Sequence, residues 1–478
     1  MTQTDGTRDD AGAGTGTASG REDGATAGGE SGTDGEPDTR QDRQRARRLA
    51  AWRAAERRLV RGANNATIRD RLDALTASAP DAYDLDDWVD IYGGGIVGEV
   101  ERRVAELLGT EAAAFFPTGT MAQQVALRCW AGRTGNPAVA IHPSAHPEMW
   151  ERDAFSTLSG LRTVHPTGKP RLPTAEEVRS LDEPFGALML ELPLREPGFV
   201  LPSWDELTAV VEAARERDAV VHFDGARLWE CTPHFGRTLP EIAALADSVY
   251  VSFYKSLGGI SGAALAGPQT LIDEAGAWRH RYGGQLFQQW PAALAALAGL
   301  DQELPRLPEY VAHAKVVAEA LGKALAAAGV PWHRIHPEGP HTHEFQLWLP
   351  YPPEVLDEAS VRLAEETRTT LFRHWNASGP GLSVTEVAVG APGLEWTEAD
   401  VTEAVAGFVE RLESEQAKAT GLKSKESVPK SKAETNAKAK GPESKGLESK
   451  GLESKAADAP AGATEPEGPT APPRTAAP

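Results

Sequence analysis

The sequence predicts an α/β fold in which a largely parallel sheet is wrapped by helices and followed by a smaller α/β domain. Between residues 98 and 254, short apolar runs typical of strands alternate with amphipathic helical runs. Such alternation is typical of parallel strands joined by helical crossovers. After Arg279 the pattern changes to longer helical runs with few strand-like runs between them. This change indicates a second, smaller domain that packs against the first.

The first domain begins with a helix over residues 98–109, whose apolar side chains recur on one helical face before Gly109 supplies a stop signal. A strand at 112–116 and a helix at 121–131 follow. The remaining elements expected in this domain are strands at 138–141, 161–164, 187–192, 219–223 and 249–254 and a helix at 204–217. In the second domain we expect helices at 291–300, 310–328, 360–369 and 398–412, and strands at 344–349 and 382–389.

Both ends of the chain are expected to be disordered. Residues 1–40 are almost all Gly, Thr, Ala, Asp, Glu and Ser, and residues 414–478 are mostly Lys, Glu, Ser, Ala and Pro. Neither composition can bury enough apolar surface to offset the entropy lost on ordering. Between the two tails we expect an N-terminal helical segment at 41–85, a large domain at 86–290 and a small domain at 291–413.

Charge and cysteine content narrow the classes of partner. The formal net charge of −20 argues against nucleic acid or an anionic membrane as partner. The Arg-rich run 40–61 is a local exception, and it predicts an amphipathic helix that docks on the core or on a partner subunit. No signal peptide and no apolar run of membrane-spanning length is expected. Cys129 and Cys231 make neither a disulfide framework nor a metal cluster, which predicts a cytoplasmic protein without a metal site.

Two charged side chains that could take part in chemistry follow strand-like runs. Asp224 comes after the run 219–223 and Lys255 after the run 249–254. Ligands of open α/β sheets bind outside the carboxyl ends of the strands, so both side chains are expected at one crevice. A lysine that forms a Schiff base and an aspartate that keeps a pyridine nitrogen protonated are the requirements of pyridoxal 5'-phosphate (PLP). The alternative is a turn aspartate and a solvated lysine.

The loop between the strand ending at Phe116 and the helix starting at Met121 reads Pro-Thr-Gly-Thr. A helix N-terminus with small and hydroxylated residues is a ready anion site, so this loop is expected to bind the cofactor phosphate. Gly119 would allow close approach and Thr120 would donate a hydroxyl. The alternative is a threonine N-cap in a tight turn. The order along the chain, with the phosphate loop first, then Asp224, then Lys255, matches a PLP site.

With these motifs in place, the chain resembles the threonine aldolase and β-eliminating lyase family of fold-type-I PLP enzymes. The resemblance covers about residues 86–300, and more weakly the rest of the folded region. It rests on the runs IYGGG, VERRVAELLGTEAAAFFPTGTMAQQVAL, HPEMWE, HFDGARLWE and FYKSLGGISGAALAG. The resemblance implies a large domain with a mostly parallel seven-stranded sheet, a smaller C-terminal α/β domain, and a homodimer or homotetramer.

The resemblance also implies roles for individual residues. The residues that would contact the cofactor are Lys255, Asp224, Gly119, Thr120, Thr118, Met121, His146 and Ser252. His146 would stack on the ring and act as a base on a β-hydroxyl group, while Arg227 would bind the substrate carboxylate. Tyr92 would reach the cofactor or a neighbouring subunit's site. The alternatives are a plain loop histidine, an arginine paired with an acid on its own helix, and a tyrosine packed in a turn.

Four features depart from the family's pattern. The opening Arg-Ser-Asp-Thr run, which contributes a substrate-facing serine, has no counterpart before Tyr92. Residues 191–196 read Glu-Leu-Pro-Leu-Arg-Glu where the family has Glu-Asn-Thr-His-Asn. Phe287 stands where an arginine is expected, and a second carboxylate-binding arginine is missing near residues 385–387. Arg195 either replaces that arginine or is a surface residue.

Three functions are compatible with these residues. The first is PLP-dependent cleavage of the Cα–Cβ bond of a β-hydroxy-α-amino acid to glycine and an aldehyde. The second is β-elimination or another amino-acid reaction, because Lys255 and Asp224 serve all of these equally well. The third is a PLP-binding scaffold without turnover. Release of glycine and an aldehyde separates the first from the second, and a Lys255→Ala variant separates an enzyme from a scaffold.

Overall fold

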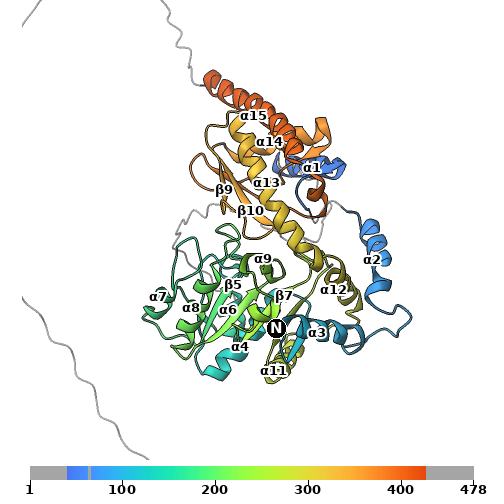
Figure 1. The fold of residues 1–478 in the computed structure, drawn as a ribbon, viewed down its shortest axis with the longest axis vertical. Helices are drawn as coiled ribbons and strands as arrows, with labels where there is room; N and C mark the ends of the chain where they lie inside the picture. The colour runs from blue at the N-terminus through green and yellow to red at the C-terminus, as the bar shows by residue number, and fades with distance from the viewer. Residues whose placement is uncertain (1–39, 63–65, 427–478) are drawn as a thin grey trace, which may run out of the picture. The chain divides into compact units, whose positions relative to one another are not determined.

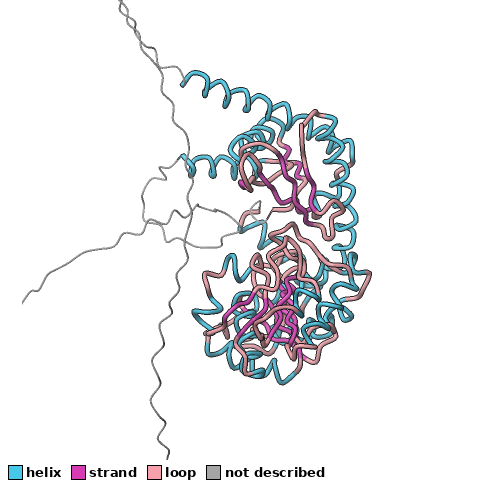
Figure 2. Tube along the Cα trace, turned by 90° about the vertical axis from the view of Figure 1, so that its left-hand side faces the viewer, coloured by secondary structure: helices cyan, strands magenta, loops and turns pink. Residues whose placement is uncertain are grey.

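The computed structural model describes residues 40–62 and 66–426, and all structural statements below concern these residues (Figure 1). The predicted N-terminal tail and most of the predicted C-terminal tail lie outside them. Within this part of the chain no helix is long and apolar enough to cross a bilayer. The described residues form a larger domain around one sheet and a smaller domain around a second sheet, which Figure 2 shows as two separate groups of strands.

A seven-stranded sheet in the order β2-β8-β7-β6-β5-β3-β4 forms the centre of the larger domain. Its strands are β2 (Ala112–Phe116), β3 (Ala138–Ala140), β4 (Arg162–Val164), β5 (Ala187–Glu191), β6 (Val220–Gly225), β7 (Ser248–Ser252) and β8 (Ala263–Gly267). Strand β8 runs antiparallel to both of its neighbours, and the other neighbouring pairs are parallel. Every strand except β8 therefore points its carboxyl end to the same edge of the sheet, which we call the carboxyl edge.

Helices cover both faces of this sheet because the strand side chains alternate between two apolar clusters. On β7, Tyr250 packs in the cluster of α4 and α11, whereas Val249 and Val251 pack in the cluster of α3, α8 and α12. The helices of these layers are α3 (Gly95–Leu108), α4 (Gly119–Thr134), α8 (Trp204–Arg215), α11 (Gln269–Arg281) and α12 (Trp290–Gln302). Shorter helices lie in the connections: α5 (His146–Trp150), α6 (Ala154–Ser159), α7 (Ala175–Arg179), η1 (Leu228–Glu230), α9 (Thr232–Phe235) and α10 (Leu239–Ala243).

The smaller domain is built on an antiparallel sheet in the order β12-β13-β10-β9. Its strands are β9 (Arg334–His336), β10 (Glu344–Leu349), β12 (Asn376–Ala377) and β13 (Ser383–Ala388). Phe345, Leu347 and Leu349 of β10 belong to its buried core, which is closed by α1 (Arg40–Ala54), α13 (Leu307–Ala327), α14 (Pro353–Thr367) and α15 (Glu398–Glu426). The alternate residues, including Glu344 and Glu386, form what we call the inward face, because they contact the larger domain.

Several elements differ from the sequence prediction. The helix predicted over 40–61 ends at Ala54, and Leu59 is buried in the small-domain core after a two-residue strand, β1 (Arg57–Arg58), that pairs with β11 (Thr369–Thr370). Helix α14 begins at Pro353 rather than at residue 360, because proline is favoured at the first helical position. Helix α15 continues to Glu426, past the predicted start of the tail at residue 414.

Several elements were not predicted, among them strand β8 and helices α11 and α2 (Ile68–Ala82). Strand β8 is rich in alanine, a poor strand former, and its place between β2 and β7 decides its conformation. Helix α2 contains Pro80 and presents Ile68 and Leu72 to solvent, so its apolar side chains do not follow a single buried face.

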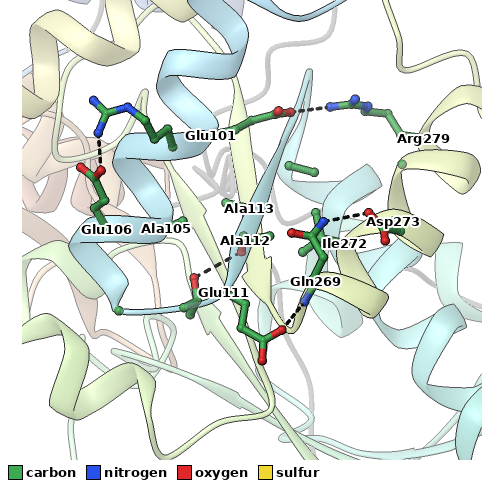
Figure 3. Close-up of a pocket in the computed structure, with 15 residues that line it drawn as sticks. Glu101, Ala105, Glu106, Glu111, Ala112, Ala113, Gln269, Ile272, Asp273 and Arg279 are labelled. Atoms are coloured by element: carbon green, nitrogen blue, oxygen red, sulfur yellow. Dashed lines mark hydrogen bonds and ion pairs between the residues drawn. The ribbon is translucent and has the colours of Figure 1, made fainter.

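Strand β2 forms one edge of the large sheet, and two charged side chains close that edge. Glu101 accepts a hydrogen bond from the Phe115 N–H group at 2.8 Å, and Arg279 donates to the Phe115 carbonyl at 2.6 Å. The same two side chains line an open cavity of about 700 Å³, shown in Figure 3. None of the sequence-predicted site residues lines this cavity. We interpret the charged pair as protection of an edge strand against pairing with another chain.

Candidate active site

The carboxyl edge of the large sheet brings together the residues that follow its strands. Asp224 lies near the end of β6, and Glu191, the last residue of β5, is its aligned partner on the neighbouring parallel strand. Both carboxylates are buried. Lys255 follows β7, and its ammonium group lies within electrostatic range of both. The predicted meeting of Asp224 and Lys255 at one crevice is therefore what the strand order produces, with Glu191 as an additional carboxylate.

The environment changes the proton affinity of these three groups. Burial and the nearby Arg227 guanidinium together lower the pKa of Lys255 to about 8, against the opposing charges of Asp224 and Glu191. Burial raises the pKa of Glu191 to about 7, and the charge of Asp224 adds to the rise. Burial also raises the pKa of Asp224, against the opposing charges of Lys255 and His146. A lysine with a lowered pKa is more often the neutral amine, which is the form that attacks a carbonyl carbon.

The N-terminus of α4 opens on the same edge, because β2 leads directly into it. Thr118 is the N-cap, and its hydroxyl accepts a hydrogen bond from the Met121 N–H group at 3.2 Å. Gly119 is the first helical residue, and a Cβ at this position would overlap the Tyr250 hydroxyl. The Ser252 hydroxyl at the end of β7 is buried and makes no hydrogen bond of good geometry to a described residue. Thr120 follows in the first turn.

His146 stands at the first position of α5, and Glu191 fixes its backbone by accepting from its N–H group at 2.7 Å. Its ring Nδ1 faces the Glu151 carboxylate at 3.3 Å, and the histidine side chain is 39% exposed whereas the Glu151 side chain is 3% exposed. The exposed ring leaves Nε2 free to face a ligand in the crevice, while the buried glutamate holds the other side of the ring.

The ion-pair partner of Arg227 differs from the one predicted from the sequence. Its Nε lies 2.5 Å from a carboxylate oxygen of Glu344, which comes from the small domain and not from its own helix. Its guanidinium lies 5.2 Å above the centre of the Phe199 ring. The proposed alternative of a pair within its own helix is therefore wrong, and a small-domain glutamate takes that place.

Arg195 is not a surface residue. Its side chain is 18% exposed and pairs with Glu196 at 3.0 Å and with Glu386 of β13 at 2.9 Å. Glu386 lies in the stretch where the family's second arginine is expected, so this part of the site carries a glutamate–arginine pair. Arg195 also lies close enough to Lys255 to lower the pKa of the lysine.

Tyr92 lies outside the group just described. Its ring packs edge-on against Phe287 at 5.6 Å, and its side chain is exposed. Gln285 donates a hydrogen bond to the Tyr92 carbonyl at 2.7 Å, and the Gln288 N–H group donates to the Ile91 carbonyl at 2.8 Å. Among the described residues, no hydrogen bond or ring contact joins Tyr92 to Lys255, Asp224 or His146. Its predicted role needs a second subunit.

The sequence analysis overlooked several residues of the site. Glu191 ends a strand at the same edge as Asp224, so the rule that found Asp224 could have found it. From the sequence, Glu151 either orients His146 or is a solvated helix residue, with the second alternative favoured. The chain turns sharply after it, with positive φ values of 51° at Arg152 and 58° at Asp153, and its buried side chain faces the His146 ring. The small-domain residues His343, Glu344 and Glu386 gave no local signal, because their partners are more than 100 residues away along the chain.

This arrangement fits an aldehyde cofactor that carries a phosphate and a basic ring nitrogen. The buried Ser252 hydroxyl, which makes no hydrogen bond of good geometry, and the N-terminus of α4 suit a phosphate. The buried Asp224 suits a protonated ring nitrogen, and Lys255 suits the aldehyde carbon. PLP has all three features.

Comparison with known proteins gives the same answer. The family model for beta-eliminating lyases matches residues 82–369. The low specificity L-threonine aldolase of Escherichia coli (strain K12) is 32% identical over 246 residues, which are 50% of this chain and 72% of that protein. The low-specificity L-threonine aldolase 1 of Arabidopsis thaliana is 29% identical over 237 residues, which are 47% of this chain and 65% of that protein.

Solved structures share the fold. A Listeria monocytogenes protein assigned to the L-allo-threonine aldolases superimposes with a TM-score of 0.70 at 33% identity, covering 78% of this chain and 99% of that one. The threonine aldolase of Leishmania major, at 18% identity, superimposes with a TM-score of 0.55 over 74% of this chain and 99% of that one. The predicted fold class is confirmed. The chain belongs to the beta-eliminating lyase family and is a lyase that depends on PLP.

Proposed function

We propose that this enzyme cleaves the Cα–Cβ bond of a β-hydroxy-α-amino acid and releases glycine and an aldehyde. The observation that carries the proposal is the His146–Glu151 pair at the mouth of the crevice that holds Lys255 and Asp224. An aldol cleavage needs a base for the β-hydroxyl proton in addition to the cofactor residues, and His146 is placed to supply it. The relatives named L-threonine aldolases support the same reaction.

When bound, PLP serves as an electron sink for the bond broken at the substrate Cα. Asp224 would keep the ring nitrogen protonated, and Lys255 would supply the amine that bonds to the cofactor aldehyde. The helix start at Thr118, Gly119, Thr120 and Met121, together with Ser252, binds the phosphate. Glu151 receives the Nδ1–H side of His146, so that Nε2 accepts the β-hydroxyl proton of the substrate. Arg227 binds the substrate carboxylate through its two terminal nitrogens.

A second candidate, β-elimination or another reaction of an amino acid, is favoured by one observation. Glu386 occupies the stretch where the family carries a second carboxylate-binding arginine, and Arg195 already pairs with it. The pocket that receives the distal part of the substrate therefore differs in charge from the family's pattern. A substrate with a leaving group at Cβ and no β-hydroxyl would not need His146 as a base.

The experiment that separates the two uses the purified protein with its cofactor. The visible absorbance of the holoenzyme is recorded before and after adding threonine, allo-threonine, phenylserine and glycine. Aldehyde is then measured with a coupled dehydrogenase. Equal amounts of aldehyde and glycine support aldol cleavage, whereas a keto acid and ammonia support elimination. A spectrum that ignores every amino acid would contradict both.

We also infer a homodimer or homotetramer. Large apolar side chains are exposed on two segments that hydrogen-bond to each other, 88–92 and 285–290, with Trp88 at 92% and Phe287 at 61% exposure. An apolar patch of this kind marks an interaction site, and it includes Tyr92, whose predicted role requires a neighbouring subunit. Sedimentation at micromolar concentration tests this inference, and a fully active monomer would contradict it.

We infer a cytoplasmic location from the cysteines. Both Cys129 and Cys231 are free and buried, and burial raises the pKa of the Cys129 thiol to about 12. Thiols kept in this form suit a reducing compartment. Fractionation of cells that produce the protein tests the location, and recovery from a secreted or periplasmic fraction would contradict it.

A further inference from the structure

Four charged residues, two of them buried and two half-buried, join the two domains beside the candidate active site. His343 and Glu344, where β10 begins, meet Glu230 and Arg227 of the large domain. His343 Nε2 lies 2.8 Å from Glu230 Oε2, and Arg227 Nε lies 2.5 Å from Glu344 Oε2. Arg227 and Glu230 are three residues apart on a 3₁₀ turn, which places both on the same side of η1. We call these four residues the charge quartet.

The geometry fixes the charge of each member. His343 Nδ1 lies 2.6 Å from the Val389 carbonyl and Nε2 faces the Glu230 carboxylate, so both ring nitrogens meet acceptors and both carry protons. The side chains of His343 and Glu230 are 2% and 0% exposed, and Tyr310 of α13 packs beside the imidazole. Two cations thus balance two anions. The quartet needs no metal ion, although Glu230, His343 and Glu344 offer ligand atoms within 4.8 Å of one another.

The quartet reaches Lys255 through one intermediate residue. Ser256, next to Lys255 in the chain, donates its hydroxyl hydrogen bond to Glu230 Oε2, the oxygen that also faces His343. The Ser256 carbonyl accepts from Arg61, so Ser256 is held at both its side chain and its backbone. Ser256 is 3% exposed. The segment that carries Lys255 is therefore tied to the small domain through Glu230.

The quartet also orients Arg227. Glu344 forms an ion pair with its Nε side, and none of the three guanidinium nitrogens makes a hydrogen bond of good geometry to a described residue. A guanidinium held at Nε presents its terminal nitrogens as a fork that matches a carboxylate. The Phe199 ring below the guanidinium limits its rotation. Glu344 thus orients Arg227 and leaves its two terminal nitrogens available to bind a substrate carboxylate.

We propose that His343 and Glu344 are positioning residues through which the small domain holds Lys255 and Arg227 in the positions in which they act. The part that concerns Arg227 rests on the proposed function, because it takes Arg227 as the residue that binds the substrate carboxylate. The part that concerns Lys255 rests only on cofactor binding. The two parts are tested by separate measurements.

The Arg227 part is tested by binding of glycine, which needs no turnover. Glycine affinity is measured from the spectral change of the holoenzyme for Glu344→Gln, Arg227→Lys and the double variant. We expect Glu344→Gln to weaken binding roughly tenfold, as misplacing a binding group does, and the double variant to match Arg227→Lys alone. Glu216→Gln, which removes a glutamate from an exposed pair with Arg179, is the matched control. Additive effects, or tighter glycine binding by Glu344→Gln, would overturn this part.

The Lys255 part is tested on cofactor-free protein with Glu230→Gln and His343→Gln. The pH dependence of Lys255 acylation is followed by mass spectrometry, and PLP affinity by equilibrium titration. We expect the midpoint of acylation to move by half a pH unit or more and PLP to bind roughly tenfold more weakly. The Glu230→Gln variant keeps the shape of the side chain, and its amide can donate a hydrogen bond to His343. This variant therefore tests the proposal even if His343→Gln does not fold. A folded Glu230→Gln variant with unchanged midpoint and PLP affinity would overturn the proposal, whatever reaction the enzyme catalyses.

Discussion

The carboxyl edge of the large sheet and the inward face of the small sheet meet at the same site, but they are built in different ways. At the carboxyl edge, each functional residue follows its own strand, so its place is set by the few residues before it. On the inward face, each charged residue is paired across the domain boundary, as in Glu344 with Arg227 and Glu386 with Arg195. The first region depends on local sequence and the second on the docking of two domains.

The difference separates two tasks. Burial at the carboxyl edge adjusts the pKa values of Lys255 and Glu191, and such adjustment suits cofactor chemistry shared by many reactions. The inward face supplies the carboxylates that pair with Arg227 and Arg195, the first of which we propose binds the substrate. We therefore expect changes at the edge to alter cofactor binding and turnover, and changes on the inward face to alter substrate binding.

The largest effect is expected at the centre of the carboxyl edge. Lys255→Ala removes the only amine placed to bond to the PLP aldehyde among the described residues at this edge, and turnover should fall on the order of 10³-fold or more. The measurement is aldehyde release, together with loss of the visible absorbance band. Lys323→Ala, which alters an exposed lysine of α13, serves as the control. Activity within tenfold of the wild type would show that Lys255 is not the cofactor lysine.

The next prediction compares two glycines of α4, one at the proposed phosphate site and one away from it. A methyl group at Gly119 would overlap the Tyr250 hydroxyl, whereas one at Gly132 on the same helix meets nothing within 4 Å. Gly119→Ala should weaken PLP binding about 10–100-fold through displacement of the helix start, as a misplacement of about 1 Å can. Gly132→Ala should leave PLP binding unchanged and stabilise the fold by about 0.5–1 kcal/mol. Equal PLP affinities of the two variants would contradict the assignment of the phosphate site.

The sequence predicts best those functional residues whose positions depend on the residues next to them in the chain. Asp224 and Lys255 could be predicted because each follows an apolar run. A threonine N-cap was one of the two predicted alternatives for the loop before α4, but the helix begins at Gly119 rather than at Met121, and this start makes Thr118 the cap. Glu191 was within reach of the rule that found Asp224. The pairs of Glu344 and Glu386 were not, because no pattern in one strand specifies which residue of another domain will face it. Strand β8 was missed for a related reason, since its neighbours and not its alanines make it a strand.

A smaller effect is expected from the glutamate behind His146. Glu151→Gln keeps the shape of the side chain but removes the charge that faces Nδ1, and kcat for a β-hydroxy amino acid should fall about tenfold, within the range of general-base contributions. PLP binding should be unchanged. Helix α5 supplies the control, because Glu148 makes a similar but more exposed pair with His165 at 3.0 Å. If Glu148→Gln and Glu151→Gln lower kcat equally, Glu151 has no specific effect on the base.

The smallest effect concerns the pH dependence of domain docking. Burial lowers the pKa of His343, but the Glu230 carboxylate, together with Glu344 and the Val389 carbonyl, raises it to about 9 from its ordinary value of 6.5. A raised pKa stabilises the folded state fully below the ordinary value, and this contribution is lost as pH rises through about 9. Glu230→Gln should remove this pH dependence, so the Tm difference between the wild type and the variant should be smaller at pH 9.5 than at pH 6. The Tm difference should shrink by about 2–4 °C for each kcal/mol of stability that the wild type loses. Lys255 changes stability in the opposite sense near pH 8, because burial lowers its pKa, so the difference between wild type and variant is the quantity to measure. A Tm difference that is constant from pH 6 to 9.5 would show that His343 is not charged in the folded protein, and the charge quartet would then lose one of its two cations.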